Sequence, residues 1–383
     1  MLGNRLLLTD SYKLGHWSMY PRGTTGVYSY FESRAGAKFD STLFFGLRPI
    51  LREKLAGEFV TREMIDEASR LAGIHFGTDQ VFNKRGWEHI LVEHGGRLPV
   101  IIKAVPEGTR VPTGNVLMTV ENTDPEVPWV TNYVESLLTH VWYPGTVATK
   151  SRAVKDMLLE FLELNGDPAG VDFMLHDFGY RGASTDEAAA IGGAAHLVNF
   201  MGTDTLIGMA AAVDFYGADL DSLAFSVPAT EHSVMTALGP DGEFDVLDDM
   251  LTQFPGGILS VVADSFDIYA FVDEVVRRKD DVLKRDGKLV VRPDSITEIH
   301  PTPESLVVDL AERLWDGFGG EINEKGFRVL DSHVGLLWGD GIDIDGIVEI
   351  VAALHRYGFA ANNIVFGMGG GLLQKVNRDT QRF

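Results

Sequence analysis

The sequence of 383 residues contains no cysteine. This absence excludes disulfide bonds, catalysis by a thiolate, and zinc or iron–sulfur sites that depend on cysteine ligands. The chain also lacks an apolar run long enough to cross a membrane, and the apolar stretch after Met1 is too short for the core of a secretory signal. We therefore expect a soluble, cytoplasmic protein.

Positive charge is scarce as well. Lysine and arginine number 33 against 55 aspartates and glutamates, which gives a formal net charge of −22. Because the backbone of a nucleic acid would be repelled overall, no nucleic acid is expected as a partner. No feature of the sequence suggests a membrane partner either. Small phosphorylated substrates remain compatible with this charge, since a few arginines and main-chain amides can form a local anion pocket.

The length suggests two domains, or one large α/β domain with an appendage, and 45% hydrophobic residues are enough for a sizeable core. Residues 1–150 form the first domain in this interpretation, with a mixed α+β pattern. Alternating or β-branched runs predict strands at residues 27–31 and 99–105, and helical spacing predicts a helix at residues 129–141.

Residues 151–383 show a regular alternation of short apolar runs with helical segments. We predict strands at residues 173–176, 196–200, 225–228, 258–263, 289–291, 334–338 and 364–366. Amphipathic helices are predicted at residues 206–216, 267–279, 303–315 and 345–357. Seven successive β-then-α units indicate an α/β fold with a largely parallel sheet or barrel.

Polar and glycine residues follow each predicted strand. They comprise residues 176–181 and 202–204, Glu231 and His232, Asp264, residues 292–294, Gly339 and Asp340, and residues 367–371. In α/β barrels the active site is built from the loops that follow the strands. Seven such ends in succession fit a site better than they fit ordinary loop polarity.

The glycine cluster Phe366-Gly-Met-Gly-Gly-Gly371 lies between a predicted strand and a helix. Consecutive glycines allow main-chain amides to approach a phosphate closely, although a tight turn without a ligand would have the same composition. The cluster lacks the Lys-Ser ending of a P-loop, and it is not a dinucleotide fingerprint. Its position late in a barrel favours phosphate binding.

Several single residues suggest chemistry without deciding it. Arg292 suits bidentate phosphate binding, and Asp294 and Asp340 suit ribose hydroxyls or Mg²⁺, although a structural ion pair or an Asp-Gly turn would look the same. His232 suits a general base, a nucleophile or a ligand, but no second histidine or carboxylate cage accompanies it. We therefore expect no dedicated metal site, and Mg²⁺ only as carried by a polyphosphate substrate.

Two aromatic residues, Phe178 and Tyr12, stand in polar motifs instead of apolar stripes. That setting suits stacking on a planar ring, although packing in the core is the commoner fate of a phenylalanine. Taken together, the strand-end residues and these rings suggest binding of phosphate, ribose and an aromatic ring.

A series of motifs closely resembles the nicotinamide phosphoribosyltransferase family. In chain order they are Thr9-Asp-Ser-Tyr-Lys13 with His16, Tyr28-Ser-Tyr-Phe-Glu32, Lys103-Ala-Val-Pro-Glu-Gly108, Gly114-Asn-Val-Leu117, Val120-Glu-Asn-Thr-Asp-Pro125, His176-Asp-Phe-Gly-Tyr-Arg-Gly182, Gly202-Thr-Asp-Thr205, Ser226-Val-Pro-Ala229, Glu231-His-Ser233 and Gly369-Gly-Gly-Leu-Leu-Gln-Lys375. They cover nearly the whole chain. The resemblance implies an irregular (β/α) barrel of the type II phosphoribosyltransferase kind, with an N-terminal α+β domain that contributes to a homodimer interface.

The resemblance also implies roles for individual residues. Phe178 and the partner subunit's copy of Tyr12 would sandwich the pyridine ring, while Asp204 would accept the carboxamide N–H and disfavour nicotinate. The phosphate and ribose groups would be held by Arg181, Arg292, Asp294, Gly339, Asp340, Gly369, Gly370, Arg378 and Arg34, the two last named across the interface. Substrates would be nicotinamide and phosphoribosyl pyrophosphate, with Mg²⁺. ATP would phosphorylate His232 transiently, with Asp264 orienting the imidazole.

The chain departs from the family pattern in three places. Met368 stands where the family usually has a serine, and Ile296 stands where it usually has a glycine. Family members also continue well past the Leu-Leu-Gln-Lys segment, so the resemblance implies a truncated or naturally short form. Two alternatives follow: a nicotinate phosphoribosyltransferase of the same fold, which Asp204 disfavours, and a non-catalytic nucleotide-binding dimer.

Overall fold

A computed structural model describes residues 1–383, and the chain divides into two compact units. The first unit comprises Met1–Thr149 together with Val376–Phe383, and the second comprises Lys150–Lys375. The boundary falls within helix α6 (Trp142–Asn165). None of the helices combines the length and the apolar character that crossing a membrane requires.

The first unit has an α+β composition. Its further elements are β1 (Tyr28–Glu32), β2 (Ser41–Leu43), α1 (Leu47–Ile50), α2 (Arg62–Phe76), α3 (Lys84–Glu93), β3 (Val100–Ala104), β4 (Arg110–Pro112), β5 (Val116–Asn122), α4 (Val130–Tyr133) and α5 (Glu135–Thr139). An antiparallel sheet has the order β1-β5-β3, and β2 pairs with β4. Rings of Trp87, Trp129 and Tyr133 pack edge to face in its core, with centroids 4.8–5.7 Å apart.

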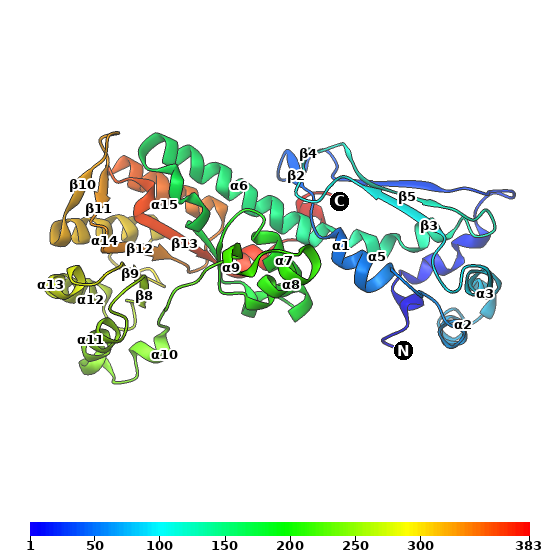
Figure 1. Ribbon diagram of the computed structural model, residues 1–383, viewed down its shortest axis with the longest axis horizontal. Coiled ribbons are helices and arrows are strands. Elements are labelled where there is room, and N and C mark those ends of the chain that lie inside the picture. Colours follow the sequence, from blue (N-terminus) through cyan, green and yellow to red (C-terminus); the bar gives the residue numbers. More distant parts are fainter. The chain divides into compact units, whose positions relative to one another are not determined.

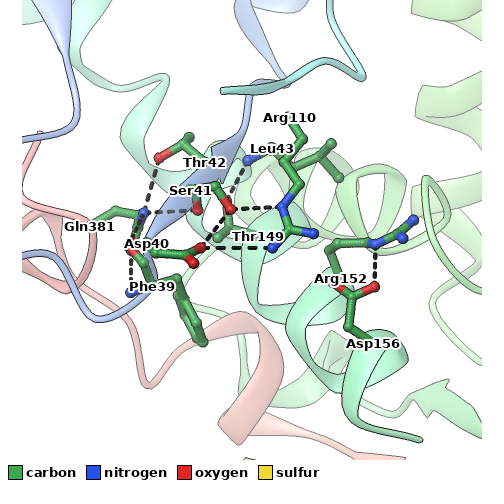
Figure 2. Close-up of polar contacts among 10 residues, drawn as sticks. All are labelled: Phe39, Asp40, Ser41, Thr42, Leu43, Arg110, Thr149, Arg152, Asp156 and Gln381. Atoms are coloured by element: carbon green, nitrogen blue, oxygen red, sulfur yellow. Dashed lines mark hydrogen bonds and ion pairs between the residues drawn. The ribbon is translucent and has the colours of Figure 1, made fainter. Parts of the chain in front are cut away.

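The last eight residues belong to the first unit, whereas the sequence analysis assigned residues 151–383 to one domain. Long-range hydrogen bonds explain the difference. The side-chain amide of Gln381 donates to the carbonyls of Phe39 and Ser41 and to the hydroxyl of Thr42 (Figure 2). Gln381 is fully buried, so these bonds satisfy a polar group that would otherwise be costly to bury. No local pattern predicts pairing across about 340 residues of chain.

The second unit contains a parallel sheet with its helices (Figure 1). Its elements are β6 (Leu175–Asp177), α7 (Asp186–His196), β7 (Gly202–Thr203), α8 (Leu206–Tyr216), α9 (Leu220–Leu223), α10 (His232–Met235), α11 (Glu243–Gln253), β8 (Leu259–Val262), α12 (Ile268–Arg277), α13 (Lys279–Leu283), β9 (Leu289–Arg292), α14 (Pro303–Phe318), β10 (Gly320–Ile322), β11 (Arg328–Leu330), β12 (Val334–Trp338), α15 (Ile344–Arg356), β13 (Ile364–Met368) and α16 (Gly370–Leu373). The sheet order is β7-β6-β13-β12-β9-β8, and all pairs are parallel.

The four predicted helices are confirmed as α8, α12, α14 and α15, of which α8 is apolar around most of its circumference and the other three are amphipathic. α14 packs between α12 and α15 and also contacts β12. Residues at their N-termini favour these helices: Asp267 and Asp343 cap α12 and α15 with their side chains, and Pro303 occupies the first turn of α14. The strands of the sheet are buried apolar runs, as expected for a parallel sheet packed against helices.

Two predicted strands are wrong in detail. Residues 196–200 are largely apolar because they lead from the end of α7 into the core, where the rings of His196 and Phe200 stack 5.3 Å apart. The strand begins only after them and comprises Gly202–Thr203. Residues 225–228 form no regular strand, because Pro228 has no N–H for a ladder. The predicted helix at 129–141 is instead two short helices, α4 and α5.

The segment 225–230 nevertheless links the two edges of the parallel sheet. Phe225 bridges to Gly202 of β7, and Ala229 bridges to Ser260 of β8, both in parallel. Main-chain hydrogen bonds of 2.7–3.1 Å support both contacts. The segment therefore closes six curled strands into an irregular barrel, and the predicted (β/α) barrel is confirmed in this form.

Candidate functional site

The sequence-predicted site residues of the second unit all follow strands or the closing segment. They are Phe178 and Arg181 after β6, Asp204 after β7, His232 after residues 225–230, Asp264 after β8, Arg292 and Asp294 at and after β9, Gly339 and Asp340 after β12, and Gly369 and Gly370 after β13. Parallel pairing places the carboxyl ends of neighbouring strands at one edge. Their contacts divide into four connected groups.

Phe178 rests on Gly367 of β13 and on Gly339, which directly follows β12. A Cβ added to Gly367 would lie 2.0 Å from Cε2 of the Phe178 ring, and one added to Gly339 would lie 3.5 Å from the same atom. The amide of Phe178 donates to the carbonyl of Met368 at 3.1 Å, which fixes the backbone below the ring. The ring is half-buried, so one part of it remains accessible.

A largely apolar cavity of about 420 Å³ opens beside this ring. Phe178, Asp204, Ser226 and Arg292 are among its lining residues. The hydroxyl of Ser226 donates to Oδ1 of Asp204 at 2.5 Å, and the amide of Asp204 donates to the carbonyl of Asp177 at 2.9 Å. These bonds orient an exposed carboxylate, whose Oδ2 can accept a hydrogen bond from a ligand.

His232 and Asp264 form a hydrogen-bonded pair. Nε2 of His232 lies 3.1 Å from Oδ1 of Asp264, and the hydroxyl of Ser295 donates to Oδ2 of Asp264 at 2.5 Å. The Asp264 side chain is 6% exposed and that of His232 is 48% exposed. Asp264 is therefore a buried carboxylate with two hydrogen bonds, and it orients the accessible imidazole of His232. Nδ1 of that imidazole is available for chemistry.

Arg292 and three carboxylates make up the third group. Nε of Arg292 is buried without a hydrogen bond, and its ion pair with Asp294 spans 3.9 Å, too long for one. A buried donor left unpaired is costly, so an oxygen of a ligand would be a favourable partner. Partial desolvation, and then the charges of Asp294 and Asp264, raise the pKa of Asp340, whereas Lys375 lowers it.

The glycine turn is the fourth group. A Cβ on Gly182 would lie 3.1 Å from Cα and N of Gly370, so the loop that carries Arg181 contacts the turn backbone to backbone. Gly370 begins α16 after Gly369. The first amides of a helix have no carbonyl partner within it, so they can donate to an anion. Arg181 is exposed beside them.

Three predicted site residues lie in the first unit. Arg34 and Arg378 line one cavity of about 510 Å³, together with Glu32 and Phe383. The guanidinium of Arg34 donates to the carbonyls of Arg382 and Phe383 at 3.0 and 3.3 Å. Tyr12 is 58% exposed. That Tyr12, Arg34 and Arg378 contribute to one site with the strand-end residues stays a prediction.

The sequence analysis missed the residues that hold the site residues in place. Ser226 orients Asp204, Ser295 orients Asp264, and Gly367 makes room for Phe178. Ser226 and Gly367 lie within motifs quoted from the sequence, and Ser295 directly follows Asp294, but none is close along the chain to the residue that it supports. Ser226 is 22 residues from Asp204 and Ser295 is 31 residues from Asp264, so no local signal indicated the supporting role.

Two family models match the chain. The model described as nicotinamide phosphoribosyltransferase, N-terminal domain, matches residues 4–102, and the model of the nicotinate phosphoribosyltransferase (NAPRTase) family matches residues 173–383. A protein of Xanthomonas campestris pv. campestris named nicotinamide phosphoribosyltransferase is 46% identical over 100% of this chain and 80% of its own length. A protein of that name from Acinetobacter baylyi is 33% identical over 99% of this chain and 81% of its own length.

Solved structures support the fold. Human nicotinic acid phosphoribosyltransferase superposes with a TM-score of 0.58 at 17% identity, covering 94% of this chain and 72% of that one. Nicotinate-nucleotide pyrophosphorylase from Pyrococcus furiosus gives a TM-score of 0.54 at 15% identity, covering 95% and 71%. At these identities the likeness concerns architecture alone.

The close contact between Gly367 and Phe178 predicts that alanine at position 367 destabilises the fold more than alanine at position 339 does. Gly367→Ala should lower the free energy of unfolding by about 1–3 kcal/mol, because the new methyl group overlaps the ring. Gly339→Ala places its methyl group at ordinary contact distance from the same ring and should cost less. Chemical denaturation of both variants measures the difference. Equal losses in the two variants would contradict the predicted packing.

The buried carboxyl group of Asp177 predicts a pH-dependent effect on stability. Burial raises its pKa to about 6, against the opposing hydrogen bond from the amide of Gly179. Because the folded-state pKa is raised, ionisation destabilises the fold as pH rises from 4 through 6, by roughly 3 kcal/mol. Asp177→Asn should therefore be more stable relative to the parent at pH 7.5 than at pH 4.5 in urea denaturation. A stability difference that does not change with pH would contradict this.

Proposed function

The chain belongs to the nicotinamide phosphoribosyltransferase family, and we propose that it forms nicotinamide mononucleotide and pyrophosphate from nicotinamide and phosphoribosyl pyrophosphate, a step of NAD biosynthesis. The observation that carries this proposal is that Phe178 and Asp204 line the same cavity, which thereby offers both an aromatic face and an oriented carboxylate. Relatives named nicotinamide phosphoribosyltransferase support it.

Asp204 would select the amide over the acid. Nicotinamide has an N–H that can donate to the carboxylate, whereas nicotinate would bring a second negative charge to it. Ser226 already donates to Oδ1 of Asp204, so Oδ2 is the atom we assign to the carboxamide. Phe178 would stack on the pyridine ring and orient its nitrogen for attack.

Phosphate and ribose would occupy the glycine turn and the charged groups around it. We assign the 5′-phosphate to the amides of Gly369 and Gly370 and to Arg181, and pyrophosphate to the unpaired Nε of Arg292. Asp294, Asp340 and the backbone at Gly339 would contact ribose hydroxyls. The ring nitrogen forms a bond to the anomeric carbon as the bond to pyrophosphate oxygen breaks, through an oxocarbenium-like transition state.

Mg²⁺ would enter with phosphoribosyl pyrophosphate. Asp264, Asp294 and Asp340 are close enough for the first two to raise the pKa of the third. Such a set of carboxylates is a suitable neighbourhood for a hard divalent cation, which relieves their repulsion. When bound, the cation neutralises charge on the departing pyrophosphate.

His232 would couple ATP hydrolysis to the reaction. Asp264 contacts Nε2, so Nδ1 is the nitrogen that would attack the γ-phosphorus of ATP and release ADP. The phosphate would later pass to water. Asp264 acts here as a positioning residue, because it sets the tautomer and orientation of the imidazole.

We also propose a homodimer with shared sites. Tyr12, Arg34 and Arg378 belong to the first unit, and all three side chains are exposed there. Each would complete the site of the partner subunit, with Tyr12 stacking on the free face of the pyridine ring. The cytoplasmic location stays a prediction from the sequence.

Asp204→Asn should weaken the preference for nicotinamide over nicotinate at least about tenfold, since like charges in contact cost several kcal/mol. The measurement is mononucleotide formed from phosphoribosyl pyrophosphate and Mg²⁺ with either pyridine. The parent chain should use nicotinamide.

The matched control is Asp249→Asn, which removes an exposed carboxylate from α11 and should leave the preference unchanged. Efficient use of nicotinate by the parent chain would refute the assignment of Asp204. Absence of product from both pyridines, in a folded dimer, would favour a nucleotide-binding role without catalysis.

His232→Ala should abolish stimulation by ATP, so the ratio of rates with and without ATP falls to about one. Labelling of the protein by ATP carrying radioactive γ-phosphate should disappear as well. His75→Ala, an exposed histidine on α2, is the control and should keep both signals. Persistent ATP stimulation in His232→Ala would contradict the phosphohistidine role but would leave the transferase proposal intact.

A further inference from the structure

A second cluster of ligating side chains lies in the first unit. It consists of His89 within α3, His94 at the end of α3, and Asp124 in the loop that precedes α4. Nε2 of each histidine lies 2.7 Å from the same atom, Oδ2 of Asp124. The three potential ligand atoms lie within 4.8 Å of one another. None of these residues takes part in the proposed transferase reaction.

Each ligating side chain stands on a fixed backbone. Trp87, two residues before His89, is fully buried in the aromatic core and anchors α3. The amide of His94 donates to the carbonyl of Ile90 at 3.1 Å. A side chain of Asn122 donates to the carbonyl of Asp124 at 2.9 Å. Rigid supports of this kind are what a preorganised site requires.

Asp124 presents one oxygen to the two imidazoles. The amide of Glu126 donates to Oδ1 at 2.8 Å, which turns Oδ2 towards the histidines. Oδ2 is therefore the carboxylate oxygen that faces both imidazole nitrogens.

We propose that His89, His94 and Asp124 bind a divalent transition metal of the zinc class. Two imidazole nitrogens and one carboxylate oxygen are ligands that zinc accepts at about 2.0–2.2 Å, with water in the fourth position. Ligand atoms around such an ion lie somewhat more than 3 Å apart, so a small outward movement of the rings admits it. The side chains of both histidines are 30% exposed, which provides an entry route and room for water.

The bound ion would clamp the end of α3 to the loop before α4. It would have a structural role, because none of its three ligands is among the residues assigned to the substrates. Spacing in the sequence does not suggest the site, since Asp124 is 30 residues from His94. The fold alone brings the third ligand to the two histidines.

Calorimetric titration of the chelator-treated full chain with Zn²⁺ tests the proposal. We expect one ion per chain at this site, and an affinity at least about tenfold weaker in His89→Ala/His94→Ala, since even indirect partners of metal ligands contribute about 10–100-fold. Asp124→Asn keeps an oxygen that both imidazoles can contact but removes its charge, so it should also weaken binding while preserving the local fold.

The matched control is His333→Ala. Nδ1 of His333 lies 2.7 Å from Oδ1 of Asp331 with similar exposure, but no second imidazole joins that pair. This variant should bind Zn²⁺ as the parent does. Unchanged affinity in the double variant and in Asp124→Asn, or no stoichiometric binding by the parent chain, would overturn the proposal.

Discussion

The six strands of the parallel sheet in the second unit run in one direction, and their main-chain hydrogen bonds determine where the residues beyond each strand end can lie. Residue Asp177 of β6 pairs with Thr203 of β7, and Met368 of β13 pairs with Asp177 on its other side. Phe178, Asp204 and Gly369 each follow one of these three residues, so the ladder alone makes them neighbours. Close glycine contacts then allow a ring and two loops to approach without a clash.

The chain is strongly acidic, yet its site residues suit an anionic substrate. The net charge of −22 is spread over the whole molecule, whereas the strand ends place Arg292 with an unpaired buried donor close to Asp294. Lys375 lowers the pKa of Asp340, whereas the neighbouring carboxylates of Asp294 and Asp264 raise it. Local cations and main-chain amides can thus outweigh the overall repulsion over a short range.

Much of the barrel was predictable because its signals are local. Buried strands appear as short apolar runs, and α12, α14 and α15 carry both an apolar face and a start signal. α7 was missed because alanine and glycine dominate it and its buried side leaves no clear stripe. Its Gly193 instead packs against Gly208 of α8, backbone to backbone.

Features that depend on distant residues could not be predicted in the same way. Gln381 joins the first unit through partners near residue 40, and Asp124 meets His89 and His94 only after the unit has folded. Candidate site residues were predicted from motifs, but the residues that hold them in place, such as Ser226 and Gly367, became clear only from contacts. Long-range pairing was therefore the information that local patterns did not contain.

A crystal structure of the full chain with nicotinamide would test the central claim most directly. The account predicts the pyridine ring stacked on Phe178, with the carboxamide nitrogen within hydrogen-bonding distance of the Asp204 carboxylate. A well-occupied ligand bound elsewhere, with Phe178 and Asp204 untouched, would contradict it.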